Sequence, residues 1–316
     1  MLNIVFMGTP EFAVPSLDIL NINHNISAVV TAPDKPAGRG RKLRQSAVKK
    51  YALAHQFKVF QPLKLKDTDF VSTLKSLKPD LIVVVAFRML PKAVWNIPPL
   101  GTINLHASLL PLYRGAAPIN HAIINGESRT GLTTFFINED IDTGKILLQT
   151  PVKISKSDTA GSLHDKLMVI GADLILKTVN DIENKSIQPS EQRMVTALKA
   201  APKLLKQDCQ INWNDKAENI YNFIRGLSPY PTSWSKIKLK DKIIRLKIYD
   251  AEFDVADHQF LPGTVIQSWP DNFAVAVKDG FIKPGTIQPE SKTSMSIKDF
   301  IQGYDIDNAK FLLPST

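Results

Sequence analysis

The sequence has one cysteine among its 316 residues, and this scarcity excludes several classes of protein. A single thiol, Cys209, forms neither an internal disulfide nor a cysteine-rich zinc site. No apolar run reaches the roughly 18 to 20 residues that a membrane-spanning helix needs. The N-terminus, MLNIVFMGTP, has no basic stretch followed by a long apolar one, so it does not match a signal peptide. We therefore expect a cytoplasmic protein with no membrane partner.

Several common catalytic and nucleotide-binding motifs are also missing. The first predicted strand is followed by GTPEFA rather than G-x-G-x-x-G, which argues against a dinucleotide site. Neither the phosphate loop G-x-x-x-x-G-K-[ST] nor the nucleophile elbow G-x-S-x-G occurs. The six histidines show no metal-ligand spacing, so we predict no metal.

Acidic residues are outnumbered, since 39 Lys and Arg against 30 Asp and Glu give a formal net charge of +9. A basic balance is typical of proteins that meet an anionic partner such as nucleic acid, but many proteins have it without such a partner. The charge is concentrated in two segments, with net +6 over residues 34–50 and net +8 over residues 193–247, so the remainder carries net −5. Two separate basic segments on a mildly acidic body favour the anionic partner.

Strand and helix patterns alternate through the first part of the chain. This alternation predicts an α/β fold with an open, mostly parallel, Rossmann-like sheet and right-handed crossovers. The β-branched run LIVVVA (81–86) is typical of a strand covered on both faces. Residues 33–44 contain two prolines, two glycines and five basic residues, which predicts a long exposed loop. The other expected strands lie at 2–8, 28–32, 58–60, 102–106, 131–138 and 145–153, and the expected helices at 10–20, 45–56, 66–77 and 159–182.

The pattern changes after the polar, proline-containing stretch ENKSIQPSEQ (183–192), which is typical of a linker. A short helix is expected over 215–225, with Asp215 as its N-cap and Gly226 as its stop. Short strand candidates separated by glycine and polar turns follow, and they predict a C-terminal small β-barrel of OB-like type. These candidates are SWSKIKL, KIIRLKIYDAEF, GTVIQSW, FAVAV and FIKPGTIQ. We therefore expect a catalytic domain over 1–188, a linker over 189–207 and a barrel domain over 208–316.

Two polar residues lie at the end of a predicted strand, where parallel α/β sheets bind their ligands. Asn104 and His106 are two positions apart, so their side chains share one face of the strand. An amide and an imidazole at a strand end can donate hydrogen bonds to a developing oxyanion. The pair alone leaves open that Asn104 satisfies a turn and that His106 is a packed core residue.

A second candidate is FFINEDIDTGKI (135–146), where Glu139, Asp140 and Asp142 lie within four positions. A strand-end aspartate can accept a proton or orient water, and one beside His106 would keep the imidazole charged. Aspartate, threonine and glycine are also turn formers, so DTG by itself fits a simple turn equally well.

Several segments together resemble the methionyl-tRNA formyltransferase family, and the match runs in order along the whole chain. The N-x-H, SLLP and DTG set is shared with a wider group of folate-dependent formyl and hydroxymethyl transfer enzymes. The GRGRKL loop and the basic C-terminal part are typical of a narrower group, the members that act on tRNA. The matching segments are MGTPEFAVPSL (7–17), PDKPAGRGRKL (33–43), NLHASLLPLYRGAAPI (104–119), DIDTG (140–144), IRGLSPYPTSW (224–234) and MSIKDFIQG (295–303).

The resemblance implies a reaction and a set of residues for it. It implies transfer of a formyl group from 10-formyltetrahydrofolate, as co-substrate, to the α-amine of methionine on initiator tRNA, by a monomeric enzyme that uses no metal. It places the catalytic trio on Asn104, His106 and Asp142. The implied folate-binding residues are Phe87, Arg88, Met89, Leu90, Ser108, Leu109, Leu110, Pro111, Asn138, Glu139, Asp140 and Ile141.

The basic segments supply the residues expected to meet tRNA phosphates. Arg88 lies where many relatives carry glycine, so it either contacts the folate or only covers the pocket. Two other functions stay open at this point: a formyltransferase acting on a small amine, and an RNA-binding protein without activity on the same scaffold. The expected tRNA-binding residues are Lys35, Arg39, Arg41, Lys42, Arg44, Lys203 and Lys206.

Overall fold

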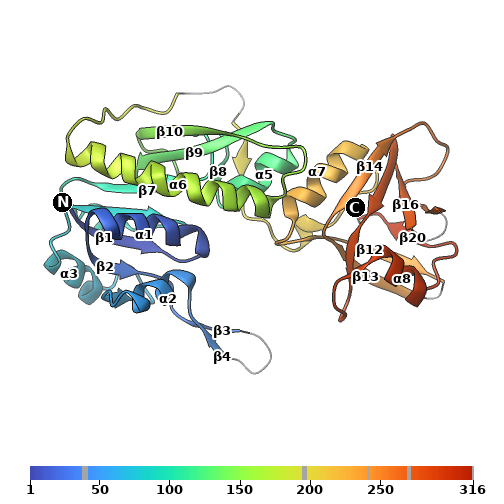
Figure 1. Cartoon of the computed structure of the whole chain (residues 1–316), viewed down its shortest axis with the longest axis horizontal. Helices are drawn as coiled ribbons and strands as arrows, with labels where there is room; N and C mark the ends of the chain where they lie inside the picture. Colours follow the sequence, from blue (N-terminus) through green and yellow to red (C-terminus); the bar gives the residue numbers. More distant parts are fainter. Residues whose placement is uncertain (38–41, 194–197, 241, 269–271, 315–316) are drawn as a thin grey trace. The chain divides into compact units, whose positions relative to one another are not determined.

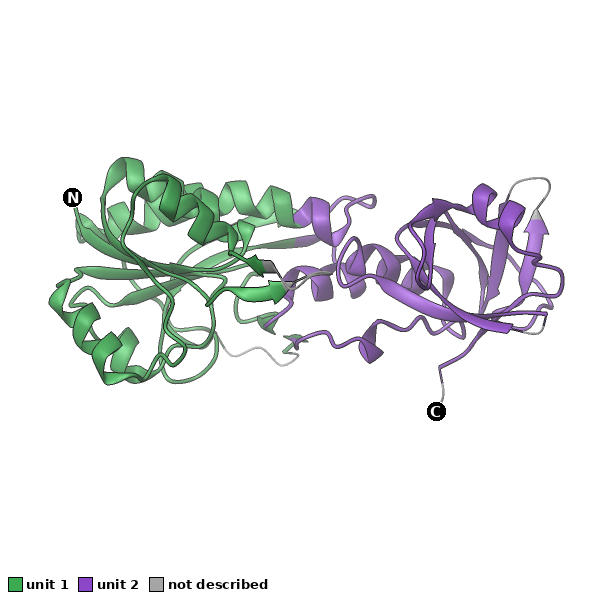
Figure 2. Ribbon diagram, turned by 90° about the horizontal axis from the view of Figure 1, so that it is seen from below, with its two compact units in different colours: residues 1–115, 130–153, 164–200 green, residues 116–129, 154–163, 201–316 purple. Residues whose placement is uncertain are grey.

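The computed structural model describes residues 1–37, 42–193, 198–240, 242–268 and 272–314. Contacts divide them into two compact units (Figure 2). Residues 1–115, 130–153 and 164–200 form the first unit, and residues 116–129, 154–163 and 201–316 form the second. The expected division into 1–188, 189–207 and 208–316 stays a prediction.

A seven-stranded sheet forms the centre of the first unit (Figure 1). The β1–β2, β1–β6, β2–β5 and β6–β7 pairs are parallel, and β7–β9 is antiparallel, so the prediction of a mostly parallel sheet is confirmed. All five residues of β6 are buried, as expected for a strand covered on both faces. In spatial order the strands are β10 (Ile146–Lys153), β9 (Arg129–Phe136), β7 (Thr102–His106), β6 (Leu81–Val85), β1 (Asn3–Gly8), β2 (Asn25–Val30) and β5 (Val59–Phe60).

Polar caps explain where two helices of this unit begin. The Ser46 hydroxyl accepts a hydrogen bond from the backbone N–H of Lys49 at 3.0 Å and caps α2, and the Asp67 carboxylate caps α3. The helix expected from Pro10 starts later, with a 3₁₀ turn before the α-helix at Val14. The helices are η1 (Glu11–Ala13), α1 (Val14–Asn23), α2 (Ala47–Ala54), α3 (Thr68–Ser76), α4 (Lys92–Trp95) and α6 (Ala160–Glu183).

The basic segment 33–44 is not entirely a loop. It contains two short strands, β3 (Lys35–Ala37) and β4 (Lys42–Arg44), which pair antiparallel (Figure 1). The expectation of a loop was therefore wrong for these six residues, because their backbones pair with one another and satisfy their hydrogen bonds locally.

The second unit contains two antiparallel sheets, with strand orders β19-β18-β13-β12-β20 and β14-β17-β16-β15. Two segments each expected as one strand, KIIRLKIYDAEF and FIKPGTIQ, bend and contribute one strand to each sheet. Gly285 lies at one bend, where an added Cβ would be 2.0 Å from Asp250 Oδ1 at the other bend, so the two corners need glycine to meet. A bridge between Thr264 and Lys310 joins the sheets again, as a barrel requires. The strands are β12 (Ser233–Leu239), β13 (Lys242–Ile248), β14 (Ala251–Val255), β15 (Val265–Ser268), β16 (Asn272–Val277), β17 (Gly280–Pro284), β18 (Thr286–Pro289), β19 (Met295–Ser296) and β20 (Lys310–Leu312).

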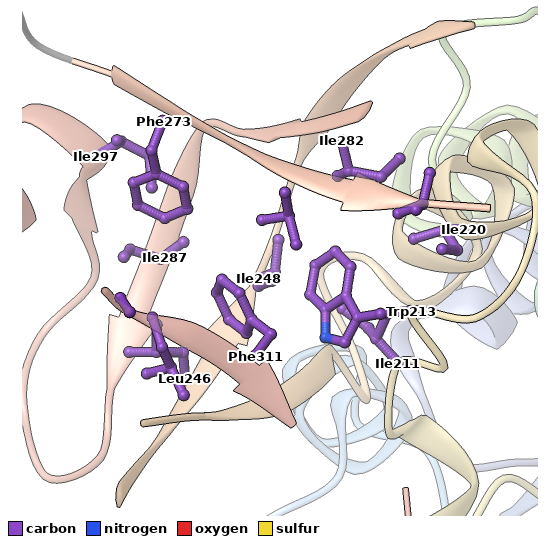
Figure 3. Packing of buried hydrophobic residues seen from close by; sticks show 14 of the residues in the cluster. Ile211, Trp213, Ile220, Leu246, Ile248, Phe273, Ile282, Ile287, Ile297 and Phe311 are labelled. Atoms are coloured by element: carbon purple, nitrogen blue, oxygen red, sulfur yellow. The ribbon is translucent and has the colours of Figure 1, made fainter. Parts of the chain in front are cut away.

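The core of this unit is formed by inward-facing side chains of both sheets. Trp213 and Phe311 are fully buried, with ring centroids 4.7 Å apart, and Phe273 and Ile248 belong to the same cluster (Figure 3). The indole N–H of Trp213 donates to the Ser235 hydroxyl at 2.9 Å, so its one polar group is satisfied inside the core.

Both expected ends of the helix near 215–225 were wrong. Helix α7 (Ala217–Leu227) has no side-chain cap from Asp215; instead, the carboxylate of Asp279 accepts from the Ala217 N–H at 2.7 Å. Gly226 lies inside the helix, where an added Cβ would be 2.7 Å from Ile124 Cγ1 of α5 (Pro118–Ile124). Its role is close helix packing rather than termination.

Candidate active site

His106 lies at the end of β7, with an acceptor beside each ring nitrogen. The side chain is almost completely buried, at 6% exposure. Its Nε2 atom is 2.9 Å from the carbonyl oxygen of Tyr113, and since a carbonyl only accepts, Nε2 carries a proton. Its Nδ1 atom is 3.7 Å from Asp142 Oδ2, which is an ion-pair distance but longer than a hydrogen bond. The structure thus brings the predicted histidine and aspartate together.

Asn104 lies two residues earlier on the same strand, half-buried and on the same face as His106. Among the described residues, none forms a hydrogen bond with its side-chain amide. A partly buried amide without a protein partner keeps its N–H groups for a ligand. Of the expected trio, His106 and Asp142 thus lie within ion-pair distance of each other. Asn104 lies on the same strand as His106, and no described residue engages its amide.

Asp142 is held by its backbone conformation and by a nearby amide. Its φ angle is +54°, in the left-handed region that aspartate tolerates better than most residues. The Gly115 N–H donates to Asp142 Oδ2 at 2.9 Å, so the carboxylate oxygen that faces His106 is also fixed by a main-chain group. Gly144 closes the turn, because an added Cβ would lie 1.6 Å from the carbonyl oxygen of Phe136.

The loop after β6, residues 87–90, carries four of the residues expected to bind the folate. The Phe87 and Leu90 side chains pack on the apolar cluster of the sheet, whereas Met89 is 70% exposed. The Arg88 guanidinium donates to the carbonyl oxygens of Leu63, at 3.0 Å, and Pro62. Burial lowers the pKa of Arg88. Arg88 therefore joins the loop after β6 to residues 62–63, and its role toward the folate stays a prediction.

The other expected folate residues divide into buried and exposed groups. Ser108 is fully buried, and its hydroxyl donates to the Leu112 carbonyl at 2.6 Å, so it stabilises the SLLP turn. Leu110 is also buried, at 4% exposure. Residues 138–141 are exposed, and Glu139 forms a 2.5 Å ion pair with Lys92, which lowers the pKa of the Glu139 carboxyl. Leu109 and Pro111 are half-buried in the same turn as Ser108.

The expected tRNA-binding residues fall in three places. Lys35 and Arg44 are exposed and directly opposite each other on β3 and β4, where like charges repel and an external anion would relieve the repulsion. Lys42 pairs through its backbone with Ala37. Lys203 and Lys206 are exposed in the second unit. Arg39 and Arg41 lie outside the described residues.

Lys206 lines a groove that the sequence did not indicate. Trp234, Lys236 and Arg245 line it too, and the indole N–H of Trp234 donates to the Lys206 carbonyl at 2.7 Å. The Arg245 guanidinium lies 5.8 Å from the centre of the Trp234 ring. Basic side chains beside an aromatic ring are typical of nucleic-acid surfaces, and only the alternation of lysines in SWSKIKLK could have signalled it.

Sequence reasoning also missed two contacts of the His106 side chain and its aspartate, namely the Tyr113 carbonyl and the Gly115 N–H. Both are main-chain groups, so residue types gave no signal beyond their position in the LYRGAAPI segment. Within the described ranges, no helix is long and apolar enough to cross a bilayer, and no group of three or more His, Cys, Asp or Glu side chains gathers as a metal site would need.

Two family models match this chain, one described as formyl transferase over residues 2–179 and one as formyl transferase, C-terminal domain, over residues 203–305. A methionyl-tRNA formyltransferase of Bacteroides thetaiotaomicron is 46% identical over 312 residues, which cover 97% of each chain. Another, of Flavobacterium johnsoniae, is 48% identical over 98% of each chain. The chain belongs to the methionyl-tRNA formyltransferase family.

Solved structures of other proteins share the fold of this chain. A sugar 3N-formyl transferase, WlaRD, solved with dTDP and 5-N-formyl-THF, has a TM-score of 0.65 at 21% identity and covers 93% of this chain and 99% of its own. HypX from Aquifex aeolicus, solved with tetrahydrofolic acid, has a TM-score of 0.64 at 16% identity and covers 96% of this chain and 47% of its own. At these identities the likeness concerns the fold alone. The family assignment rests on the full-length relatives.

Proposed function

We propose that the protein transfers the formyl group of 10-formyltetrahydrofolate to the α-amine of methionine on initiator methionyl-tRNA. The products are N-formylmethionyl-tRNA and tetrahydrofolate, and the role is in translation initiation. The observation that carries this proposal is the near-complete coverage by relatives that are methionyl-tRNA formyltransferases. The His106–Asp142 pair, together with an Asn104 amide that no described residue engages, supports this proposal.

The reaction begins with attack of the neutral amine on the formyl carbon. A tetrahedral intermediate forms, and the former carbonyl oxygen becomes negatively charged. The Asn104 amide supplies N–H groups that stabilise this oxyanion. His106 supplies Nδ1–H when its ring is charged, because its Nε2–H is already held by the Tyr113 carbonyl. The Asn104 amide has no competing partner among the described residues, so it needs no rearrangement to do so.

Asp142 takes the next part of the reaction. The attacking nitrogen becomes positively charged and must lose a proton before the C–N bond to the folate breaks. A carboxylate within 3.7 Å of the His106 ring can accept that proton, directly or through water, and can offset the charge of the imidazole. The leaving nitrogen of the folate then takes up a proton, which completes the exchange.

The folate lies in this proposal between the loops 87–90 and 138–142. Met89 and Ile141 are exposed apolar side chains, at 70% and 61%, on the two loops. Such side chains can pack against the ring faces of a folate. Leu110 and Ser108 are buried, so in this proposal they shape the pocket by holding the SLLP turn rather than by touching the folate.

The tRNA is met by phosphate contacts from Lys35, Arg44, Lys203 and Lys206, together with Lys42, Arg39 and Arg41. The repulsion between Lys35 and Arg44 across β3 and β4 supports this role. Binding by phosphate contacts weakens as salt rises. An affinity for tRNA that is insensitive to salt would count against it.

The direct test supplies labelled 10-formyltetrahydrofolate with three acceptors in parallel: methionyl initiator tRNA, methionyl elongator tRNA and a small amine such as an amino-sugar nucleotide. The proposal expects label on initiator methionyl-tRNA above the others. Label on the small amine, with none on tRNA, would place the protein with the small-amine enzymes. Binding of tRNA without any transfer would indicate an inactive RNA-binding protein.

A further inference from the structure

Residue Gln192 lies at the start of the expected linker and reaches the loop that carries Asp142. Its Nε2 atom donates to the carbonyl oxygens of Asp142, at 2.8 Å, and Gly144, at 2.9 Å. These are the first and last residues of the DTG turn. No other described side chain donates a hydrogen bond to these two carbonyls, so Gln192 holds the turn at both ends.

The orientation of the Gln192 amide is fixed by a second contact. The Arg114 Nη2 and Nε atoms lie 2.6 and 3.2 Å from Gln192 Oε1. A guanidinium only donates, so the oxygen of the amide must face Arg114 and its nitrogen must face the two carbonyls. One side chain thus matches donors on one side and acceptors on the other, which neither a carboxylate nor an apolar side chain can do.

The segment before Gln192 is itself attached to the sheet. Ser190 and Ile146 form an antiparallel bridge, with N–O distances of 2.8 and 2.9 Å between their backbones. The bridge places the chain beside the beginning of β10, directly after the DTG turn. Gln192 therefore acts from an anchored backbone, which a free linker would not provide.

We propose that Gln192 is a positioning residue for Asp142, resting on the proposed formyl transfer. Asp142 has a φ of +54°, a backbone conformation that non-glycine residues hold at a cost. The Gln192 bonds hold this turn in place, so that Oδ2 meets both the Gly115 N–H and the His106 ring. The beginning of the linker is in this way a part of the catalytic site.

Gln192→Glu tests the proposal with a change of one atom. The carboxylate keeps an acceptor for Arg114 and adds a charge pair with it, but its second oxygen repels the carbonyls of Asp142 and Gly144. We expect kcat to fall about tenfold or more, since a small misplacement of a catalytic group has large effects on rate. The KM for methionyl-tRNA should stay within about twofold.

The matched control is Glu191→Ala, at the neighbouring position. Glu191 is 74% exposed and its carboxylate pairs with Lys145 at 3.0 Å, without touching the DTG turn. This variant should keep the wild-type kcat. A kcat of Gln192→Glu equal to that of Glu191→Ala would overturn the proposal.

A second measurement needs no substrate. The Gly115 amide resonance in the ligand-free protein reports the hydrogen bond to Asp142 Oδ2. It should move in Gln192→Glu in the same direction as in Asp142→Ala, and stay in place in Glu191→Ala. An unchanged Gly115 resonance in Gln192→Glu would refute the positioning role, even where formyl transfer itself failed in the wild-type protein.

Discussion

Replacing Arg225 with alanine is expected to lower the free energy of unfolding by about 3 kcal/mol. Arg225 lies on α7 and is only 7% exposed. Its Nη1 atom donates to the Asp158 carbonyl at 2.7 Å, and its Nε atom donates to Asn222 Oδ1 at 2.8 Å. The guanidinium therefore joins the helix to the 154–163 segment of the same unit.

The magnitude follows from these two bonds. A hydrogen bond from a charged donor contributes about 1.5 kcal/mol or more, and the alanine variant loses the donor of both bonds. Two such bonds give about 3 kcal/mol. The third contact, to the Ser155 carbonyl at 3.4 Å, is too long to add much.

The assay is urea unfolding, followed by far-UV circular dichroism and tryptophan fluorescence. Arg129→Ala is the matched control, because it removes the same charge from an exposed position and should change stability by less than about 0.5 kcal/mol. An Arg225→Ala protein with the stability of Arg129→Ala would refute the reasoning. The unfolding transitions followed by the two probes must coincide, so that the free energies compared belong to a single two-state transition.

Three other predictions concern single positions. Gly144→Ala should lower the rate of formyl transfer at least about tenfold, because the new Cβ would lie 1.6 Å from the Phe136 carbonyl oxygen and move the Asp142 turn. The control is Gly303→Ala, where an added Cβ has nothing within 4 Å. Full activity of Gly144→Ala would contradict the account. Cys209 is 1% exposed and burial raises the pKa of its thiol, so it should react with a disulfide reagent at pH 8 only after denaturation; fast labelling of the folded protein would argue against this. Two hydrogen bonds lower the pKa of Asp34, the one from Lys49 more than the one from Gln61. The carboxylate therefore stabilises the fold above the pKa that Asp34 has in the unfolded chain, and this stabilisation is lost as pH falls through the lower pKa of the folded state. The stability gap between Asp34→Asn and wild type, from urea unfolding at several pH values, should accordingly narrow toward pH 3, and a gap that widens would contradict it.

The strands and the larger helices of the first unit were predictable because their apolar patterns are local. LIVVVA became β6, and the N-x-H pair stands at the end of β7 as its spacing required. The ends of α7 were not predictable, since its N-terminal N–H is satisfied by Asp279, a residue far along the chain. Gly226 was expected to end the helix, because a glycine that allows close helix packing cannot be told in sequence from one that terminates a helix.

The candidate site shows the same division. The residue types of Asn104, His106 and Asp142 are visible in the sequence, and the contact of His106 with Asp142 agrees with the expectation drawn from it. The groups that hold them are main-chain atoms of Tyr113 and Gly115 and the side chain of Gln192, which the sequence placed in a linker. These groups reach the site only through tertiary folding, so no local sequence pattern predicts their contacts.

The most direct test of the central claim is single-turnover transfer of labelled formyl from 10-formyltetrahydrofolate to methionyl initiator tRNA by the wild type and by Asn104→Ala. The account predicts N-formylmethionyl-tRNA with the wild type, and a rate constant about a hundredfold to a thousandfold lower when the oxyanion donor is removed. Equal rate constants for the two proteins, at saturating co-substrate and tRNA, would contradict it.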